Sequence, residues 1–381
     1  MKKLLILTAL LLCLTLVGCG PNGEQSNSAE SNTGNDNTVN NTYSFKTIEE
    51  MRSFVPSGED DIFNLLGYYN AGDIAIGQFY WDADCEDADN GGTVIKATDS
   101  EKGRYIRLRV SNVSNPAWFG AIADDKNDDS DAIQKALAEL QNGGTLAIEP
   151  GNYLISKPIE LKTSGIRITG IGNVTLTVTD KSDGAIVIDG ASNVGVYDIN
   201  IIGNGKADSG ILVKGECKNI SMKTISIAQF AKVGLNISGN VSGGIYEEIN
   251  VVSAKPSSVG LSVSGGANDI VFTACTFDML NASKCVAGEF KYTHDLTFQN
   301  CTFTTKSIES SGTVFVGGEK DGYPKAVGFY GCDVINAVVN EDDGTIGKIH
   351  FFGFMTHSGQ SVPKHEKIYG STDDGTFFGI S

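Results

Sequence analysis

The chain reads Gly184-Ala-Ile-Val-Ile-Asp-Gly190 near its middle, and this short strand pattern returns three times. The later copies begin at successive offsets of 25, 24 and 26 residues, and they read Ser209-Gly-Ile-Leu-Val-Lys-Gly215, Val233-Gly-Leu-Asn-Ile-Ser-Gly239 and Val259-Gly-Leu-Ser-Val-Ser-Gly265. A period of this length, with alternating apolar residues in each copy, is typical of one coil of a β-solenoid. The sequence therefore predicts stacked coils.

A second strand pattern follows each copy. It reads Asn193-Val-Gly-Val-Tyr-Asp-Ile-Asn-Ile201 in one coil and Asp269-Ile-Val-Phe-Thr-Ala-Cys-Thr-Phe277 in a later one. Because each strand pairs with its counterpart in the next coil, about 4.8 Å away, inward residues should stack in columns. The expected columns are Ile199, Ile225, Ile249, Cys275, Cys301 and Cys332; Val196, Met222, Phe272 and Phe298; and Phe277 and Phe303. Cysteine would act there as a small buried hydrophobe, with a disulfide between neighbouring coils as the alternative.

The composition agrees with an all-β protein and limits the partners. The chain has 46 glycines and a formal charge of −17. This charge argues against nucleic acid as a partner, and against a strongly acidic sugar polymer unless a metal or a lysine cluster intervenes. The sequence contains no phosphate loop, no dinucleotide-binding glycine motif and no closely spaced Cys/His set.

The N-terminus reads as an export signal. Lys2 and Lys3 precede a short apolar run that is too short to span a membrane comfortably. The run ends in Leu16-Val-Gly-Cys19, which resembles the lipobox of bacterial lipoproteins. The resemblance implies a signal peptide over 1–18, lipid on Cys19 and an exported protein anchored to a membrane. An ordinary cleaved signal is the alternative.

Polar residues over 19–43 predict a flexible tether. Beyond a small module at 44–111, an amphipathic helix is expected near 129–141, where its apolar face would cap the open end of the solenoid. The carboxylates around its start favour the positive end of the helix, and a calcium loop is the alternative for them. They are Asp124, Asp125, Asp128, Asp129 and Asp131.

Three segments carry a family resemblance. They are Gly120-Ala-Ile-Ala-Asp-Asp125, Asp129-Ser-Asp-Ala-Ile-Gln134 and Gly143-Gly-Thr-Leu-Ala-Ile-Glu-Pro-Gly-Asn-Tyr153. Together they resemble the opening of the pectate-lyase superfamily, in the group of tailspike, rhamnogalacturonase-like and epimerase-like proteins. The resemblance implies a right-handed parallel β-helix over 112–381, with an irregular cap near 340–381.

Residues 44–111 resemble the small module that precedes such helices in tailspike-type proteins. Its run Phe79-Tyr-Trp81 could stack on sugars, or pack against the entrance of the helix. Tailspike-type proteins are often trimers, so the resemblance leaves a trimer open.

The resemblance also places the substrate on the sheet formed by the Gly-Ile-x-Ile strands, with the loops before these strands as walls. Hydrolases of the superfamily carry several carboxylates there. At the corresponding positions this chain has only Asp208, which lies one residue before the position that the family's carboxylate would occupy. Lyases of the superfamily use an arginine, or sometimes a lysine, as base; the last arginine here is Arg167, and a lysine base stays open. The residues that remain as candidates for binding substrate are Asp208, Lys255, Lys284, Lys291, Tyr292 and Tyr323.

The later coils concentrate the residues that could do acid–base chemistry. Asp278, Glu289 and His294 are the candidate catalytic residues. His294 aligns with Asn268 and Asn219 of other coils, so a histidine that caps a turn is the alternative. No cofactor is predicted, with calcium left as an alternative.

Two functional hypotheses follow. One is a surface-anchored protein that acts on a polysaccharide as a lyase, hydrolase or epimerase. The other is a glycan-binding or adhesive lipoprotein that keeps the fold without the catalytic residues of the family. The absent carboxylates and arginine favour the second hypothesis, so the sequence leaves catalysis undecided.

Overall fold

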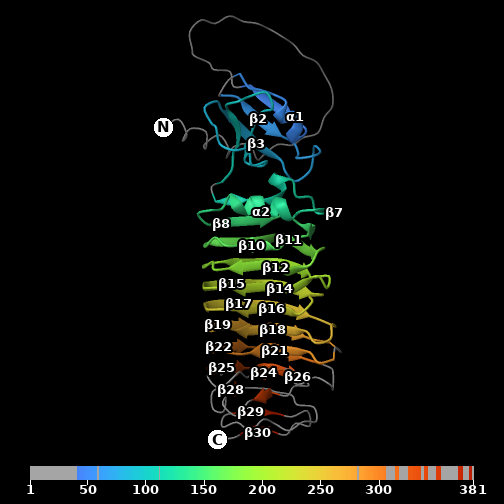
Figure 1. Ribbon diagram of the computed structural model, residues 1–381, viewed down its shortest axis with the longest axis vertical. Helices are drawn as coiled ribbons and strands as arrows, with labels where there is room; N and C mark the ends of the chain where they lie inside the picture. The colour runs from blue at the N-terminus through green and yellow to red at the C-terminus, as the bar shows by residue number, and fades with distance from the viewer. Residues whose placement is uncertain are drawn as a thin grey trace, which may run out of the picture. The chain divides into compact units, whose positions relative to one another are not determined.

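A computed structural model describes residues 41–57, 60–110, 112–280 and 283–305, together with 314–316, 325–335, 339–341, 349–352, 368–371 and 377–379. It confirms the all-β fold: successive coils of a right-handed parallel β-helix stack on one another, as Figure 1 shows from green to orange. The signal segment 1–18, Cys19, most of the tether 19–43 and most of the C-terminal cap 340–381 lie outside the described residues.

Each coil presents three faces. Face 1 is an eight-stranded parallel sheet that contains the Gly-Ile-x-Ile strands of the repeat. Its strands are β10 (Ile159–Leu161), β12 (Ser182–Asp189), β14 (Ala207–Lys214), β16 (Val233–Ser238), β18 (Val259–Ser264), β21 (Val286–Phe290), β24 (Val314–Val316) and β27 (Val339–Glu341).

Faces 2 and 3 share long strands that bend at a corner. These strands are β11 (Ile166–Val178), β13 (Gly195–Ile202), β15 (Cys217–Ala228) and β17 (Val241–Val252). Face 2 also contains β8 (Gly144–Ile148), β19 (Asn268–Thr273), β22 (His294–Gln299), β25 (Lys325–Tyr330) and β28 (Ile349–Phe352). Face 3 also contains β9 (Gly151–Ile155), β20 (Thr276–Asp278), β23 (Thr302–Thr304) and β26 (Asp333–Ile335).

Two columns of left-handed residues turn the chain at the edges of face 2. At its corner with face 3, successive coils place Asp198, Thr224, Glu248, Ala274 and Asn300 at φ of 52–58°. At its start, the column is Asn193, Asn219, Gly243, Asp269, Asp295 and Ala326. A left-handed residue bends the chain sharply within one position, and Asn, Asp and Gly tolerate it best.

The inward columns confirm the stacking expected from the repeat. The register pairs Ile199 with Ile225 and then Ile249, and Cys275, Cys301 and Cys332 continue the column. All six side chains are buried. The cysteines of the described residues are not joined in disulfides; they are Cys85, Cys217, Cys275, Cys285, Cys301 and Cys332.

The aromatic column is longer than expected. It runs through Tyr246, Phe272, Phe298 and Phe329, whose ring centroids are 4.8–4.9 Å apart. Stacked aromatic pairs of this kind contribute about 0.5–1.5 kcal/mol beyond the burial of their area.

The expected capping helix is α2 (Ser130–Ala138), which buries Ala132, Ile133, Ala136 and Leu137. Asp128 holds its start, because its Oδ1 accepts bonds from the Ser130 amide and hydroxyl, at 3.1 and 2.6 Å, while Ser156 donates to both carboxylate oxygens. Burial opposes the charge on Asp128, but these bonds from Ser130 and Ser156 lower the pKa of Asp128 to about 2. The carboxylate thus serves the helix start as a cap.

Asp129 behaves in the opposite way. It occupies the N-cap position without capping the helix; its Oδ1 accepts the Ile122 amide at 2.7 Å, and Oδ2 is buried without a partner. Burial, reinforced by the charges of Asp124 and Asp128, raises the pKa of Asp129 to about 7.

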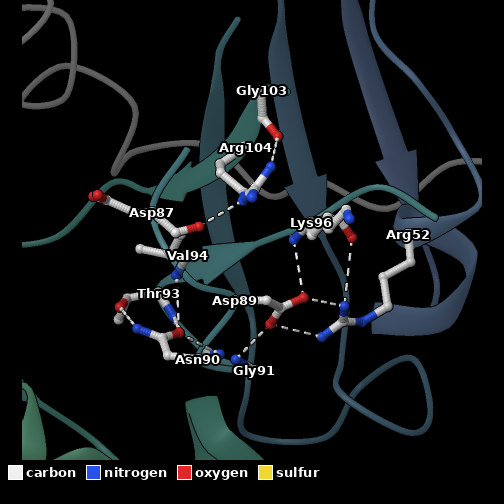
Figure 2. A network of polar contacts seen from close by, with 11 residues as sticks. Arg52, Asp87, Asp89, Asn90, Gly91, Thr93, Val94, Lys96, Gly103 and Arg104 are labelled. Atoms are coloured by element: carbon white, nitrogen blue, oxygen red, sulfur yellow. Dashed lines mark hydrogen bonds and ion pairs between the residues drawn. The ribbon is translucent and has the colours of Figure 1, made fainter. Parts of the chain in front are cut away.

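The N-terminal module is a sheet of β1 (Thr42–Phe45), β2 (Ile62–Leu65), β3 (Gly77–Asp82), β5 (Arg104–Arg107) and β4 (Val94–Ile95), with helix α1 (Ile48–Arg52). Phe79 and Trp81 are buried in its core, so they pack rather than stack on sugars. Figure 2 shows how Arg52 holds the 86–96 loop: both guanidinium Nη atoms donate to Asp89, which also accepts the amides of Gly91 and Lys96.

Glu139 joins this module to the entrance of the β-helix. It follows α2 and accepts bonds of 2.8 Å each from Asn90, Thr93 and Arg109. Nearby, the buried guanidinium of Arg107 lies 5.0 Å from the ring of Trp118, in the short 3-10 helix η2 (Pro116–Phe119). Strands β6 (Val113–Ser114) and β7 (Asp124–Asp128) then pair with β8 and β9.

The last described strands are β29 (Ile368–Ser371) and β30 (Phe377–Gly379), which pair with each other antiparallel. None of the described helices is long and apolar enough to cross a membrane.

Candidate functional site

Face 1 carries an outward strip of polar side chains between ion pairs. Asp208 lies 2.7 Å from Lys232 on the next coil, and Lys214 lies 3.6 Å from Asp189. Further along, Glu289 lies 2.5 Å from Lys291. The outward, half-buried positions between these pairs are short: Asn236, Ser238, Ser262 and Ser264. Two of the predicted binding residues, Asp208 and Lys291, belong to these ion pairs, and Lys255 lies in the loop before β18, the strand that carries Ser262 and Ser264.

The predicted catalytic residues lie in three different places. Asp278 ends β20 on face 3, where its Oδ1 accepts the Leu280 amide at 2.9 Å. Glu289 points outward from face 1, and His294 begins β22 on face 2. In the part of the chain that the structure describes, no hydrogen bond or ion pair joins any two of the three.

The remaining predicted residues belong to loops and turns. Lys255 and Lys284 lie in the loops before β18 and β21, between faces 3 and 1, and Lys284 is left-handed. Tyr292 is 43 % exposed in the turn from face 1 to face 2. Tyr323 lies outside the described residues.

The register corrects one alignment. His294 pairs with Asn268, as expected, but the residue opposite Asn219 two coils further on is Asp269, and Asp295 follows it. The left-handed position of the turn is therefore held by Asp295, and His294 precedes it.

An open hollow of about 410 Å³ lies on face 2 beside this turn. We call it the face-2 hollow. Its floor is the outward row Val271, Thr297 and Gly328, one residue from each of three successive coils. The other lining residues are Asp269, Asp295, Leu296, Ala326 and Tyr330.

Two carboxylates form one side of the face-2 hollow. Asp269 and Asp295 occupy equivalent positions on neighbouring coils, each at φ 55°, so their Cα atoms are about one ladder spacing of 4.8 Å apart. The Nδ1 atom of His294 lies 2.7 Å from Oδ2 of Asp295. The imidazole thus orients one of the two carboxylates.

An aromatic ring forms the other side. Tyr330 is 42 % exposed, and its ring lies over Gly328, because a Cβ at that glycine would be 2.6 Å from Cε2 of the ring. The exposed Ile245 precedes Val271 in the same outward row. The hollow therefore combines paired acceptors, a hydroxyl and an apolar surface.

Sequence reasoning placed Asp295 in the same acid–base stretch as His294 without choosing it as a candidate, and it did not single out Asp269 or Tyr330. A usable signal was the repeat itself: Asp replaces Asn at the turn position of two neighbouring coils, next to a coil with an outward tyrosine.

Comparison with known proteins decides the family. Residues 112–332 match the family described as rhamnogalacturonase A/epimerase, pectate lyase-like. The chain belongs to this family. Residues 44–110 match the phage tail protein small four-stranded β-sheet domain.

The similar proteins match either over a short segment or at low identity. A probable rhamnogalacturonase C of Aspergillus niger is 36 % identical over 70 residues, which are 18 % of this chain and 15 % of that relative. Tailspike gp49 of Acinetobacter baumannii bacteriophage Fri1, a capsular polysaccharide depolymerase, is 13 % identical with a TM-score of 0.60, over 83 % of this chain and 70 % of that one.

The enzymatically active domain of tailspike protein 2 of bacteriophage CBA120 is 15 % identical with a TM-score of 0.61, over 86 % of this chain and 52 % of that one. The chain thus spans about a seventh of the curated relative and about half of this tailspike domain.

Proposed function

We propose that this protein recognises a polysaccharide through the face-2 hollow while lipid on Cys19 anchors it to a bacterial membrane. The observation that carries the proposal is the face-2 hollow itself, where two carboxylates on neighbouring coils face a tyrosine ring across a floor of short side chains. Its volume of about 410 Å³ is in the range of small-molecule sites.

The lining suits the chemistry of sugars. Carboxylates accept hydrogen bonds from adjacent hydroxyl groups, and such charge-assisted bonds are stronger than neutral ones. The faces of Tyr330 and Val271 offer apolar surface to the C–H groups of a sugar ring. The fold also supports the proposal by association, since the relatives include a rhamnogalacturonase and a capsular polysaccharide depolymerase.

A binding experiment tests the proposal. The Tyr330→Ala variant should lose at least about tenfold in affinity for any polysaccharide that the wild type binds, measured by glycan array and then by calorimetry. Tyr69→Ala is the matched control, because Tyr69 is 50 % exposed in the N-terminal module. Equal binding by wild type, Tyr330→Ala and Tyr69→Ala would refute the face-2 hollow as the binding site.

One observation favours cleavage as a second candidate function. Retaining glycosidases use a closely spaced pair of carboxyl groups, and Asp269 and Asp295 place two carboxylates at equivalent positions on neighbouring coils. Release of reducing ends that disappears in Asp269→Asn and in Asp295→Asn would support hydrolysis. Binding without any release, and without the ultraviolet absorbance of unsaturated uronides, would leave glycan recognition as the function.

The anchor has its own test. Cells fed a labelled fatty acid should incorporate the label into the wild type and not into Cys19→Ser. Equal labelling of both proteins would refute the lipid anchor.

A further inference from the structure

We infer that the sugar unit bound in the face-2 hollow is uncharged, so that the protein selects neutral glycans and rejects polyuronides. The inference rests on the proposed function, because it names the class of sugar that the same hollow accepts. It differs from what the family would suggest, since pectate-type substrates are acidic.

The charges in the lining carry the inference. Asp269 and Asp295 are the charged residues among those that line the face-2 hollow, and both are negative. A sugar carboxylate placed between Tyr330 and this pair would lie next to two like charges, and like charges at such short range repel even when partly solvated. A neutral ring, in contrast, offers hydroxyl donors that both carboxylates can accept.

Among the lysines whose side chains the structure describes, two near face 2 pair with carboxylates outside the face-2 hollow. Lys291, close to the turn that leads into face 2, lies 2.5 Å from Glu289. Lys223, on an earlier coil of the same face, lies 2.9 Å from Glu247. Lys255 and Lys284 belong to the loops at the far edge of face 1. His294 bonds to Asp295 and orients that acceptor.

The apolar half of the lining also favours an uncharged sugar. Gly328 leaves room for the ring of Tyr330 to lie flat over the backbone, and Val271 continues that surface. A flat apolar surface opposite hydrogen-bond acceptors suits a ring with one C–H face and hydroxyl edges. Selection then has two separable parts: stacking that depends on Tyr330 and Gly328, and charge rejection that depends on the two aspartates.

The experiment uses the full chain on a glycan array that carries matched pairs, such as oligogalacturonides with their methyl esters and sialylated glycans with their desialylated forms. In each pair that gives a signal, the uncharged member should bind at least about tenfold more tightly at low salt. The difference should shrink in about 1 M NaCl, because salt screens the repulsion.

The Asp269→Asn/Asp295→Asn variant is the decisive comparison. Asparagine occupies the same left-handed column at Asn193 and Asn219, so the substitution suits the backbone. It should reduce the preference for the uncharged member to less than about threefold. Asp84→Asn, an exposed aspartate of the N-terminal module, is the matched control and should leave the preference unchanged.

The outcomes separate the two proposals. Tighter binding of the acidic members, or a preference that survives in the double variant, would overturn the inference while the proposed function stands. Absence of binding to any glycan of the array would overturn both. Gly328→Ala should weaken the binding of neutral and acidic glycans to the same extent, because it displaces the Tyr330 ring without changing the charge of the hollow.

Discussion

Asp129 makes the stability of the protein depend on pH in a direction that is unusual for an aspartate. The side chain is 1 % exposed, and burial raises its pKa to about 7, against an ordinary value of 3.8. In the unfolded chain the carboxyl group loses its proton near pH 3.8; in the folded protein it keeps the proton up to about pH 7. The folded state therefore binds one more proton between these values, and the free energy of unfolding falls as the pH rises through this window.

The size of the effect follows from the two pKa values. Between about pH 4.5 and 7 the proton linkage amounts to roughly 3 kcal/mol, at about 1.4 kcal/mol for each pH unit. The asparagine of an Asp129→Asn variant cannot titrate. The difference in unfolding free energy between the wild type and this variant should therefore change by roughly 3 kcal/mol between about pH 4.5 and pH 8, in favour of the variant at the higher pH.

Urea denaturation at both pH values measures this difference, and the comparison cancels every other group that titrates alike in the two proteins. Asp128→Asn is the matched control. The hydrogen bonds that lower the pKa of Asp128 to about 2 stabilise the protein above pH 3.8, and this contribution is lost as the pH falls through 2. Its difference from the wild type should thus change much less than that of Asp129→Asn from about pH 4.5 to 8, because the variant loses only the smaller contribution of the Asp128 charge to the raised pKa of Asp129. A difference for Asp129→Asn that stays constant over the same pH range would refute the burial of an ionisable Asp129.

Three further predictions address the coils and their entrance. Phe298→Ala should lower the free energy of unfolding by about 3–5 kcal/mol, because the buried ring stacks on Phe272 and Phe329; a loss below about 1 kcal/mol in urea would contradict the column. Thr224→Asn should raise the free energy of unfolding by about 1 kcal/mol, and with it the melting temperature, since threonine is strained at φ 54° and Asn300 occupies the same column. An unchanged or lower melting temperature would count against the strain. Glu139→Ala should speed hydrogen exchange in residues 90–110, because Asn90, Thr93 and Arg109 lose their acceptor at a cost of about 1–3 kcal/mol; protection equal to that of the wild type would show that other contacts hold the module.

The fold was predictable because the apolar residues that point inward recur once in every coil. Ile199, Ile225 and Ile249 recur at nearly constant spacing, and the buried column tolerates cysteine as a substitute for isoleucine, so the period survives the change of residue. The column expected from the sequence left out Tyr246, which lies between Met222 and Phe272 in the register. In the structure, the Tyr246 hydroxyl is buried without a partner.

The site was harder to predict, because it depends on outward residues that no period constrains. Asp269 and Asp295 resemble ordinary turn residues, since the left-handed column selects Asn, Asp and Gly for the backbone alone. Only the register shows that both carboxylates border one hollow and that Tyr330 lies across it. Asp278, Glu289 and His294 are close in sequence. The chain turns once between Asp278 and Glu289 and again between Glu289 and His294, so the three residues lie on three different faces.

A crystal structure of the protein soaked with a neutral oligosaccharide that it binds would test the central claim most directly. The account predicts a sugar ring against Tyr330, with hydroxyl groups within hydrogen-bond distance of Asp269 and Asp295. A sugar seated instead along the outward strip of face 1, between Asp208 and Glu289, with the face-2 hollow empty, would contradict it.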